Sequence, residues 1–208
     1  MSEGLAVEIQ ILVIVGIAGL VILIIFFQRQ TQLWAWNDLA VRTGLVCDSG
    51  KYLWSPIRVT GLYRGHSLIL DTFTRGSGKN SRTYTRAVLS VNNPVPIQLV
   101  LSEEKVFDKM GKWMGVQDIQ VGDETLDRRY KIKGQPEAEI VRLLASWEVR
   151  RKLLEVSSLK IEIEAGEVRA EKHGTEKKVE ELEKAFELLS GIAEEVERIG
   201  SPSYGGSV

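Results

Sequence analysis

The sequence predicts an α+β protein with one N-terminal transmembrane helix, an antiparallel β meander, and a C-terminal half built as helix, hairpin and helix. Three observations lead to this fold class. A run of seventeen apolar residues occupies 11–27, strand-like segments lie between 57 and 101, and helical periodicity returns after residue 136. The strand-like segments are short and closely linked, which favours antiparallel pairing over βαβ units.

The apolar run is expected to cross a membrane as a helix. At about 1.5 Å per residue, seventeen residues cover roughly 26 Å, and two flanking residues bring the span, 9–28, close to the ~30 Å hydrocarbon core. A cleaved signal peptide fits less well, because Glu3 and Glu8 precede the run without any basic residue and no small-residue cleavage site follows it. A buried helix of a soluble protein is rarely apolar on every face.

The charges that flank this span predict its orientation. Acidic residues precede it, and basic residues follow it, among them Arg29 and Arg42. Because basic flanks stay on the cytoplasmic side, we expect a short extracytoplasmic N-terminus (1–8), a single-pass anchor in the cell membrane, and a cytoplasmic C-terminal domain. Trp34 and Trp36 are expected at the membrane interface, where aromatic rings concentrate.

Residues 31–45 are expected to form a juxtamembrane amphipathic helix. Apolar and small residues recur at spacings of three and four from Leu33 to Thr43, and Gly44 is suited to end a helix. Such a helix either lies in the membrane interface or packs on the soluble domain. Only Arg42 would support contact with anionic lipid, so packing on the domain is the preferred interpretation.

Residues 51–199 are expected to form the soluble α+β domain, which is β-rich up to residue 101. Segments rich in β-branched and aromatic residues, separated by Gly, Asn and Pro, are typical of antiparallel strands. A hairpin loop is predicted at 76–80 and another turn at 92–96. The four predicted strands are 57–60, 67–70, 83–88 and 97–100.

The helix-rich part, 102–199, begins with mixed elements. Ser102 is expected to cap a short helix over 103–110, and an irregular segment is expected before a strand at 129–133. Pro136 would open the next helix, because its missing N–H costs nothing at the first position. The apolar stripe of that helix comprises Ile140, Leu143, Leu144, Trp147 and Leu154.

The end of the chain predicts a hairpin and a long helix. Residues 159–170 alternate apolar and charged side chains around a turn at 165–166, so one face would be buried. Thr175 opens a helix with a heptad-like seam, which packs on the sheet in the preferred interpretation and joins a partner or a second copy through 179–196 in the alternative. A flexible tail is expected over 200–208. The seam comprises Val179, Leu182, Phe186, Leu189, Ala193 and Val196.

Several short patterns resemble an uncharacterised prokaryotic family. The patterns are W-x-x-L-A and T-G-L within 36–45, G-x-Y-R-G at 61–65, Q-D-I-Q-x-G-D at 117–123, and D-R-R-Y at 127–130 with Gly134. Proteins of this kind often carry a membrane span. The resemblance covers most of 36–198 and implies a membrane-linked α+β domain. It brings no known activity and no site residues.

Charge is unevenly distributed along the chain. The net charge of −1 combines +4 in residues 1–100 with −5 in 101–208, and between 51 and 100 seven basic residues accompany one acid, Asp71. Basic strands could contact anionic lipid headgroups, where each Lys or Arg contributes about 1 kcal/mol, or form a solvated face. The net negative charge of the whole chain argues against nucleic-acid binding. The candidate anion-binding residues are Arg58, Arg64, Arg75, Lys79, Arg82 and Arg86.

No motif identifies an enzyme, and no cofactor or metal site is expected. The loop 75–80 lacks the first glycine and the final Ser or Thr of a P-loop, and it joins two strands. The acidic run 118–127 is interpreted as solvated and capping carboxylates, with a divalent-cation site as the alternative. A pairing of His66 with Cys47 or Ser67 stays open as a nucleophile and base.

Three functions follow, in order of preference. The first is a non-enzymatic, membrane-anchored cytoplasmic binding or scaffold domain that contacts anionic lipid headgroups or a protein partner. The second is an accessory subunit of a membrane protein complex, docked through its span or its last helix. The third is an unrecognised hydrolase or transferase.

Overall fold

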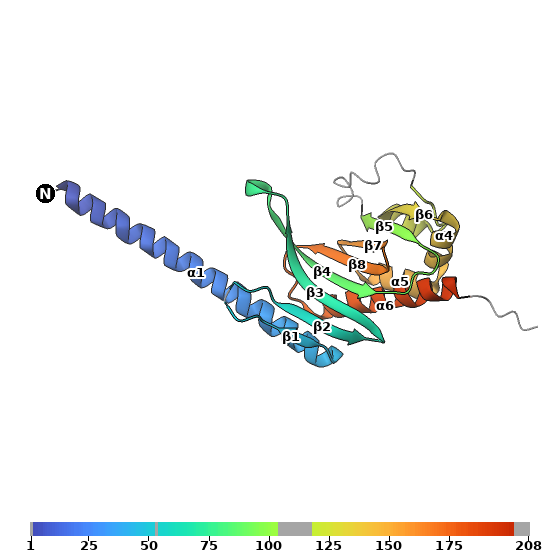
Figure 1. The fold of residues 1–208 in the computed structure, drawn as a ribbon. Helices are drawn as coiled ribbons and strands as arrows, with labels where there is room; N and C mark the ends of the chain where they lie inside the picture. The colour runs from blue at the N-terminus through green and yellow to red at the C-terminus, as the bar shows by residue number, and fades with distance from the viewer. Residues whose placement is uncertain (1, 53, 104–117, 202–208) are drawn as a thin grey trace, which may run out of the picture.

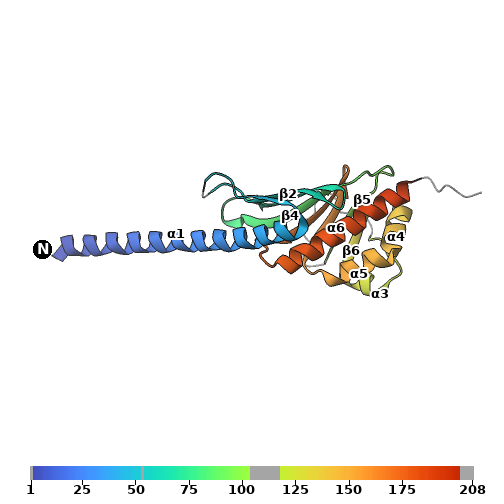
Figure 2. The ribbon, with the colours of Figure 1, turned by 90° about the horizontal axis from the view of Figure 1, so that it is seen from below.

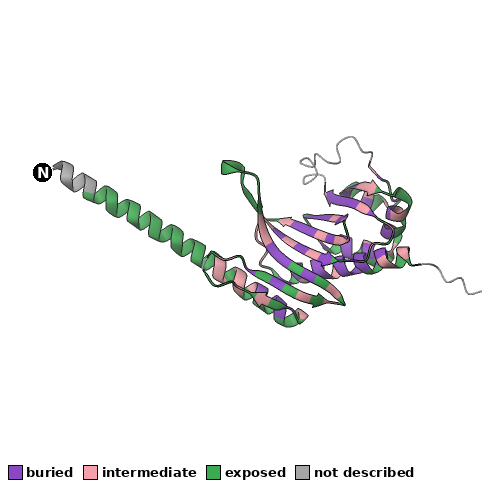
Figure 3. Ribbon diagram, in the orientation of Figure 1, coloured by how far each residue is buried: buried purple, intermediate pink, exposed green. Residues whose placement is uncertain are grey.

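One continuous helix, α1 (Ser2–Thr43), combines the predicted span with the predicted juxtamembrane helix (Figure 1). The computed structural model describes residues 2–52, 54–103 and 118–201. Helix α1 is long and apolar enough to cross a membrane, and its apolar stretch protrudes fully exposed from the rest of the protein (Figure 3). No Gly or Pro occurs between residues 20 and 43, so the polar residues after the span, which are good helix formers, continue the helix.

Gly44 ends α1, as the sequence predicts. Its φ of +71° is left-handed, and the Leu45 N–H donates to the Ala40 carbonyl at 2.9 Å. This six-residue return satisfies one of the free carbonyls at the end of the helix and reverses the chain into the first strand.

Eight antiparallel strands form one sheet in the order β1-β2-β3-β4-β8-β7-β5-β6. The α+β class is confirmed, but the fourth predicted strand does not pair with the third. The β7–β8 hairpin lies between them, so the β-rich and helix-rich parts share one sheet. The strands are β1 (Val46–Asp48), β2 (Arg58–Tyr63), β3 (His66–Arg75), β4 (Arg82–Ser90), β5 (Gln98–Glu103), β6 (Tyr130–Gln135), β7 (Leu159–Glu164) and β8 (Glu167–His173).

Helix α6 lies diagonally across one face of the sheet, beside the C-terminal part of α1 (Figure 2). All six residues of its predicted seam are buried inside the chain. The seam therefore packs on the sheet, and it is not free to join another molecule. The helices beyond α1 are α3 (Glu124–Arg129), α4 (Glu137–Ala145), α5 (Trp147–Glu155) and α6 (Val179–Gly200), and a short 3-10 turn, η1 (Gly78–Asn80), lies in the β3–β4 loop.

Two predictions for the helix-rich part are wrong. Ser102 is fully buried inside β5, and Glu103, the first residue of the predicted helix, is the last residue of the same strand; residues 104–110 lie outside the described residues. The helix expected after Pro136 is two helices, because Ser146, with φ −59° and ψ 120°, departs from helical geometry between α4 and α5. Trp147, at the start of α5, is consequently exposed and leaves the apolar stripe.

Candidate functional site

Trp36 joins α1 to the soluble domain. Its ring is 0% exposed, and its indole Nε1 donates to the Glu176 carbonyl at 2.9 Å. Leu39 and Ala40, three and four residues later on the same helix face, are also buried. A ring enclosed in this way cannot reach lipid headgroups, so the expected interfacial position of Trp36 is wrong. Trp34 is 72% exposed, and its interfacial role stays a prediction.

Arg29, just beyond the apolar stretch of α1, holds a surface loop against the helix by hydrogen bonds. Its guanidinium donates to the carbonyls of Ser55 at 2.7 Å, Ser49 at 2.6 Å and Tyr52 at 3.2 Å. Gly50 is required in this loop, because its φ is +67° and a Cβ there would lie 2.2 Å from Ser55 Cβ. The loop that follows β1 is thereby held at the level where the span ends.

Two exposed aromatic rings project from this loop. Tyr52 and Trp54 stack with centroids 5.5 Å apart, and Trp54 is 82% exposed. The sequence prediction missed this pair, because the segment between β1 and β2 is far from the span in sequence. The two aromatic residues beside Lys51 are the one sequence signal that could have indicated an interfacial loop. The hydrogen bonds from Arg29 show that this loop lies next to the end of the apolar stretch.

The six predicted basic residues do not form one surface. Arg58 is exposed at the start of β2, and Lys79 and Arg82 are exposed around the tip of the β3–β4 hairpin. In Figures 1 and 2 this tip lies at the end of the sheet from which the exposed part of α1 emerges. Arg64 lies in the β2–β3 turn, at the other end of these strands, and bonds Glu187 at 2.5 Å. Anion binding stays a prediction for the six residues, of which Arg64, Arg75 and Arg86 also contact carboxylates.

The other basic residues of the sheet are matched by carboxylates on neighbouring strands. Asp71, Arg86, Glu171 and Lys160 are successive register partners across β3, β4, β8 and β7, on the sheet face opposite α6. Arg86 donates twice to Asp71, at 2.9 and 2.7 Å, and Arg75 bonds Glu171 at 3.0 Å. The Asp71 carboxylate raises the pKa of the Arg86 guanidinium. These ion pairs stabilise strand pairing, and their carboxylates neutralise most of the positive charge on this part of the sheet.

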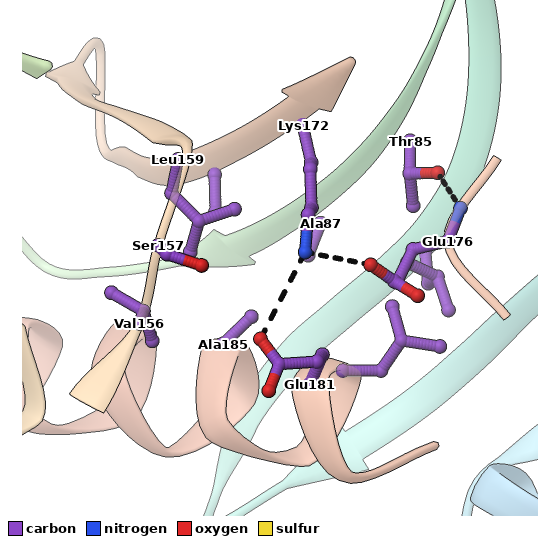
Figure 4. Close-up of a pocket in the computed structure, with 12 residues that line it drawn as sticks. Thr85, Ala87, Val156, Ser157, Leu159, Lys172, Glu176, Glu181 and Ala185 are labelled. Atoms are coloured by element: carbon purple, nitrogen blue, oxygen red, sulfur yellow. Dashed lines mark hydrogen bonds and ion pairs between the residues drawn. The ribbon is translucent and has the colours of Figure 1, made fainter. Parts of the chain in front are cut away.

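A small pocket between the sheet and α6 contains Lys172 (Figure 4). The Lys172 ammonium lies 2.7 Å from a Glu176 oxygen and 3.8 Å from a Glu181 oxygen. Thr85 accepts the Glu176 N–H at 2.8 Å and donates to the Gly174 carbonyl at 2.8 Å. The cavity measures about 20 Å³, which is room for about one water. It is therefore a structural joint that holds the start of α6 on the sheet.

Glu187 organises a second ion cluster at the far end of the domain. It accepts the Tyr63 hydroxyl at 2.7 Å, and the buried Lys152 ammonium lies 3.4 Å from its other oxygen. Burial, reinforced by the Glu187 carboxylate, raises the pKa of the Tyr63 phenol. The cluster ties the β2–β3 turn to α5 and α6. An ionised, hydrogen-bonded carboxylate of this kind has a structural role. Its partners are so far apart in the sequence that no sequence pattern reveals the cluster.

The histidine pairings that remained open for catalysis are not formed. Cys47 lies opposite Val59 and Leu70 across three strands, about 13 Å along β3 and about 10 Å across the sheet from His66. Ser67 follows His66 along a strand and points to the other face. The His66 Nε2 instead lies 3.3 Å from Glu197. Burial raises the pKa of the Cys47 thiol, which disfavours its thiolate.

The acidic run 118–127 braces the start of α3. Asp123 caps α3 by accepting the N–H groups of Thr125 and Leu126, and Asp127 accepts those of Val121 and Gly122. Within the described ranges no group of three His, Cys, Asp or Glu side chains could hold a metal ion. The capping interpretation is confirmed for Asp123.

Comparison with known proteins shows the fold of this chain. No family model matches the sequence, and no curated protein matches it. The structure is similar to the crystal structure of the mycobacterial trehalose monomycolate transport factor A, TtfA, with a TM-score of 0.53 and 8% sequence identity. The alignment covers 77% of this chain and 91% of TtfA. At this identity, the likeness concerns the fold.

Proposed function

We propose that this chain is a non-enzymatic accessory factor of a membrane transport assembly, anchored by one helix and holding its α+β domain against the cytoplasmic face of the membrane. The fold likeness to TtfA, described as a transport factor, supports the kind of assembly. The acidic residues before the span and the basic residues after it support a cytoplasmic domain.

The continuity of α1 carries this proposal. The same helix holds the exposed apolar stretch and, from Trp36 onwards, part of the domain core. Arg29 and Trp36 are seven residues apart, so about 10 Å of helix separates the end of the span from the core. A flexible linker would let the domain tumble, whereas a rigid connection presents one fixed surface to a neighbour in the membrane.

The parts of the domain closest to the span fit contact with the bilayer surface. Tyr52 and Trp54 stand beside Arg29, and Trp34 is exposed on α1. Tyr and Trp rings concentrate at the headgroup level of membranes. Lys79 and Arg82 add positive charge on the same side, which anionic lipid attracts. The aromatic loop thus takes the anchoring role that the sequence assigned to Trp36.

Loosening α1 tests the accessory-factor proposal. A Gly-Ser-Gly-Gly insertion after Gln30 would keep the span and the domain but uncouple them. We expect photo-crosslinks from the domain to an integral membrane transport protein in the wild-type chain and their loss in this variant. The matched control carries the same insertion after Gly200. Crosslinks that survive insertion after Gln30 would contradict rigid presentation, and a chain that crosslinks to no membrane protein would contradict the accessory role.

A second candidate function is direct binding of anionic lipid headgroups by the domain. The exposed cations at the end of the sheet favour it. It predicts that the association of the hairpin tip with the bilayer weakens as salt increases, because the Debye length shrinks to about 3 Å at 1 M. Salt-independent fluorescence of a probe at Ser77, in bilayers containing phosphatidylglycerol, would exclude it.

A further inference from the structure

A groove lies where the span ends, between α1 and the segment that leads into α6. Its volume is about 210 Å³, roughly ten times that of the single-water pocket beside Lys172. It can therefore receive a phosphate group with the atoms attached to it. The lining residues are Ile25, Gln28, Arg29, Gln32, Thr175 and Lys177.

The two cations of this groove contact neutral oxygens. Arg29 donates to three backbone carbonyls, and the Lys177 ammonium donates to the Thr31 hydroxyl at 2.7 Å. An arginine has five N–H donors and a lysine has three, so both side chains keep donors beyond these contacts. Neither positive charge is cancelled by these partners.

No carboxylate is among the six lining residues. The nearest acid in sequence is Glu176, whose side chain lies 2.7 Å from the Lys172 ammonium and also accepts the backbone N–H groups of Lys177 and Lys178 (Figure 4). Gln28 and Gln32 add amide donors, and Thr175 adds a hydroxyl. The groove therefore combines two positive charges with neutral hydrogen-bond donors, which is the chemistry that binds phosphate.

The position of the groove matches the depth of lipid phosphates. Ile25 belongs to the apolar span, and Arg29 is the first charged residue after it. A helix that crosses the hydrocarbon core places this turn at the headgroup region. An anionic lipid of the same leaflet could place its phosphate in the groove and its acyl chains along the span, beside Ile25.

We infer that this groove binds the phosphate of an anionic phospholipid headgroup, with Arg29 and Lys177 as the charged contacts. The inference rests on the membrane anchoring in the proposed function. It adds a defined lipid site that is independent of the exposed basic residues of the sheet. A lipid bound there would bridge α1 and the start of α6, and so hold the domain at a fixed height.

Two matched pairs of variants test the site in the full-length chain. K177Q removes a cation of the groove, and K178Q removes the neighbouring cation outside it. Q32E places a carboxylate in the groove, and Q30E makes the same change about 200° around the helix. Each chain is reconstituted in nanodiscs of phosphatidylcholine with phosphatidylglycerol, and the lipids that stay bound are counted by native mass spectrometry.

We expect K177Q and Q32E to retain about fivefold less phosphatidylglycerol than the wild type, because one charge near the lipid surface changes binding by about that factor. K178Q and Q30E should retain wild-type amounts. Equal retention by all four variants would overturn the site. T31V keeps the Lys177 charge and should retain lipid within twofold, and thermal unfolding of every variant identifies any that fails to fold.

Two further measurements separate the explanations. In the first, glycerol 3-phosphate or inorganic phosphate is added to the detergent-solubilised chain. We expect glycerol 3-phosphate to displace bound phosphatidylglycerol. Binding of free phosphate by a chain that retains no lipid would overturn the lipid assignment. Resistance of the chain to an alkaline wash of membranes tests anchoring alone. A chain removed by that wash would refute the proposed function, whereas an anchored chain with no retained lipid would refute only the groove.

Discussion

Positive side chains are held differently on the sheet and at the end of the span. On the sheet, Arg86 has the Asp71 carboxylate in register at 2.7 Å. At the end of the apolar stretch, Arg29 and Lys177 donate to carbonyl and hydroxyl oxygens. The first arrangement uses charge to fix strand pairing, and in the second the charged groups contact neutral oxygens. The partners that the fold supplies, more than the number of basic residues, therefore decide which cations are available to a ligand.

The largest effect is expected from breaking the joint between these regions. W36A removes a fully buried ring and its hydrogen bond to Glu176, so the free energy of unfolding of the domain should fall by about 3–5 kcal/mol. W34A, two residues away and exposed, should change it by less than about 0.5 kcal/mol. Denaturant unfolding of the detergent-solubilised chain, followed by circular dichroism, measures both. Similar losses for both variants would mean that α1 is not sealed into the core at Trp36.

A smaller effect is expected from uncoupling a charge pair on the sheet. D71A leaves the Arg86 guanidinium without the carboxylate that accepts two of its hydrogen bonds, which should cost about 2 kcal/mol of unfolding free energy. K79A, at the exposed hairpin tip, should change it by less than about 0.5 kcal/mol. The same unfolding assay applies. A K79A loss equal to that of D71A would show that the tip is as structural as the sheet.

Acid should weaken the joints around α6. Desolvation opposes the shift, but the Lys172 ammonium and backbone amides lower the pKa of Glu176, and the Tyr63 hydroxyl with Arg64 and Lys152 lowers that of Glu187. Since both folded-state pKa values lie below the ordinary value of 4.5, this stability is present above pH 4.5 and is lost as pH falls through the folded values. E176Q should flatten the decline below pH 4.5 in a series of thermal unfolding curves. An unchanged decline in both E176Q and E187Q would assign it to other groups.

Local patterns predicted much of the fold. The unbroken apolar run indicates the exposed part of α1, the alternation at 159–164 indicates β7, and the seam from Val179 to Val196 indicates the buried face of α6. These signals lie within single elements, where spacing alone decides which side chains share a face. The insertion of the β7–β8 hairpin beside β4 depends on pairing between distant segments, and no local pattern encodes it.

The candidate site was harder to predict, for the same reason. Trp34 and Trp36 differ by two residues, yet one is exposed and the other is sealed by the Glu176 carbonyl, 140 residues away. From the sequence, Arg29 is only a flanking charge that predicts the orientation of the helix. The structure shows that it also binds the loop around Tyr52. The basic count between 51 and 100 overstated the free charge, because the acids that match it, such as Glu171 and Glu187, come from the second half of the chain.

The depth of the aromatic loop tests the central claim most directly. In a C47S background, which removes the single cysteine, an environment-sensitive fluorophore is attached at K51C beside Tyr52 or at W147C on α5. The chain is then placed in nanodiscs whose lipids carry a quencher at the headgroup. The account predicts strong quenching at residue 51 and little at residue 147. Equal quenching at both positions would show that α1 does not hold the aromatic end of the domain against the membrane.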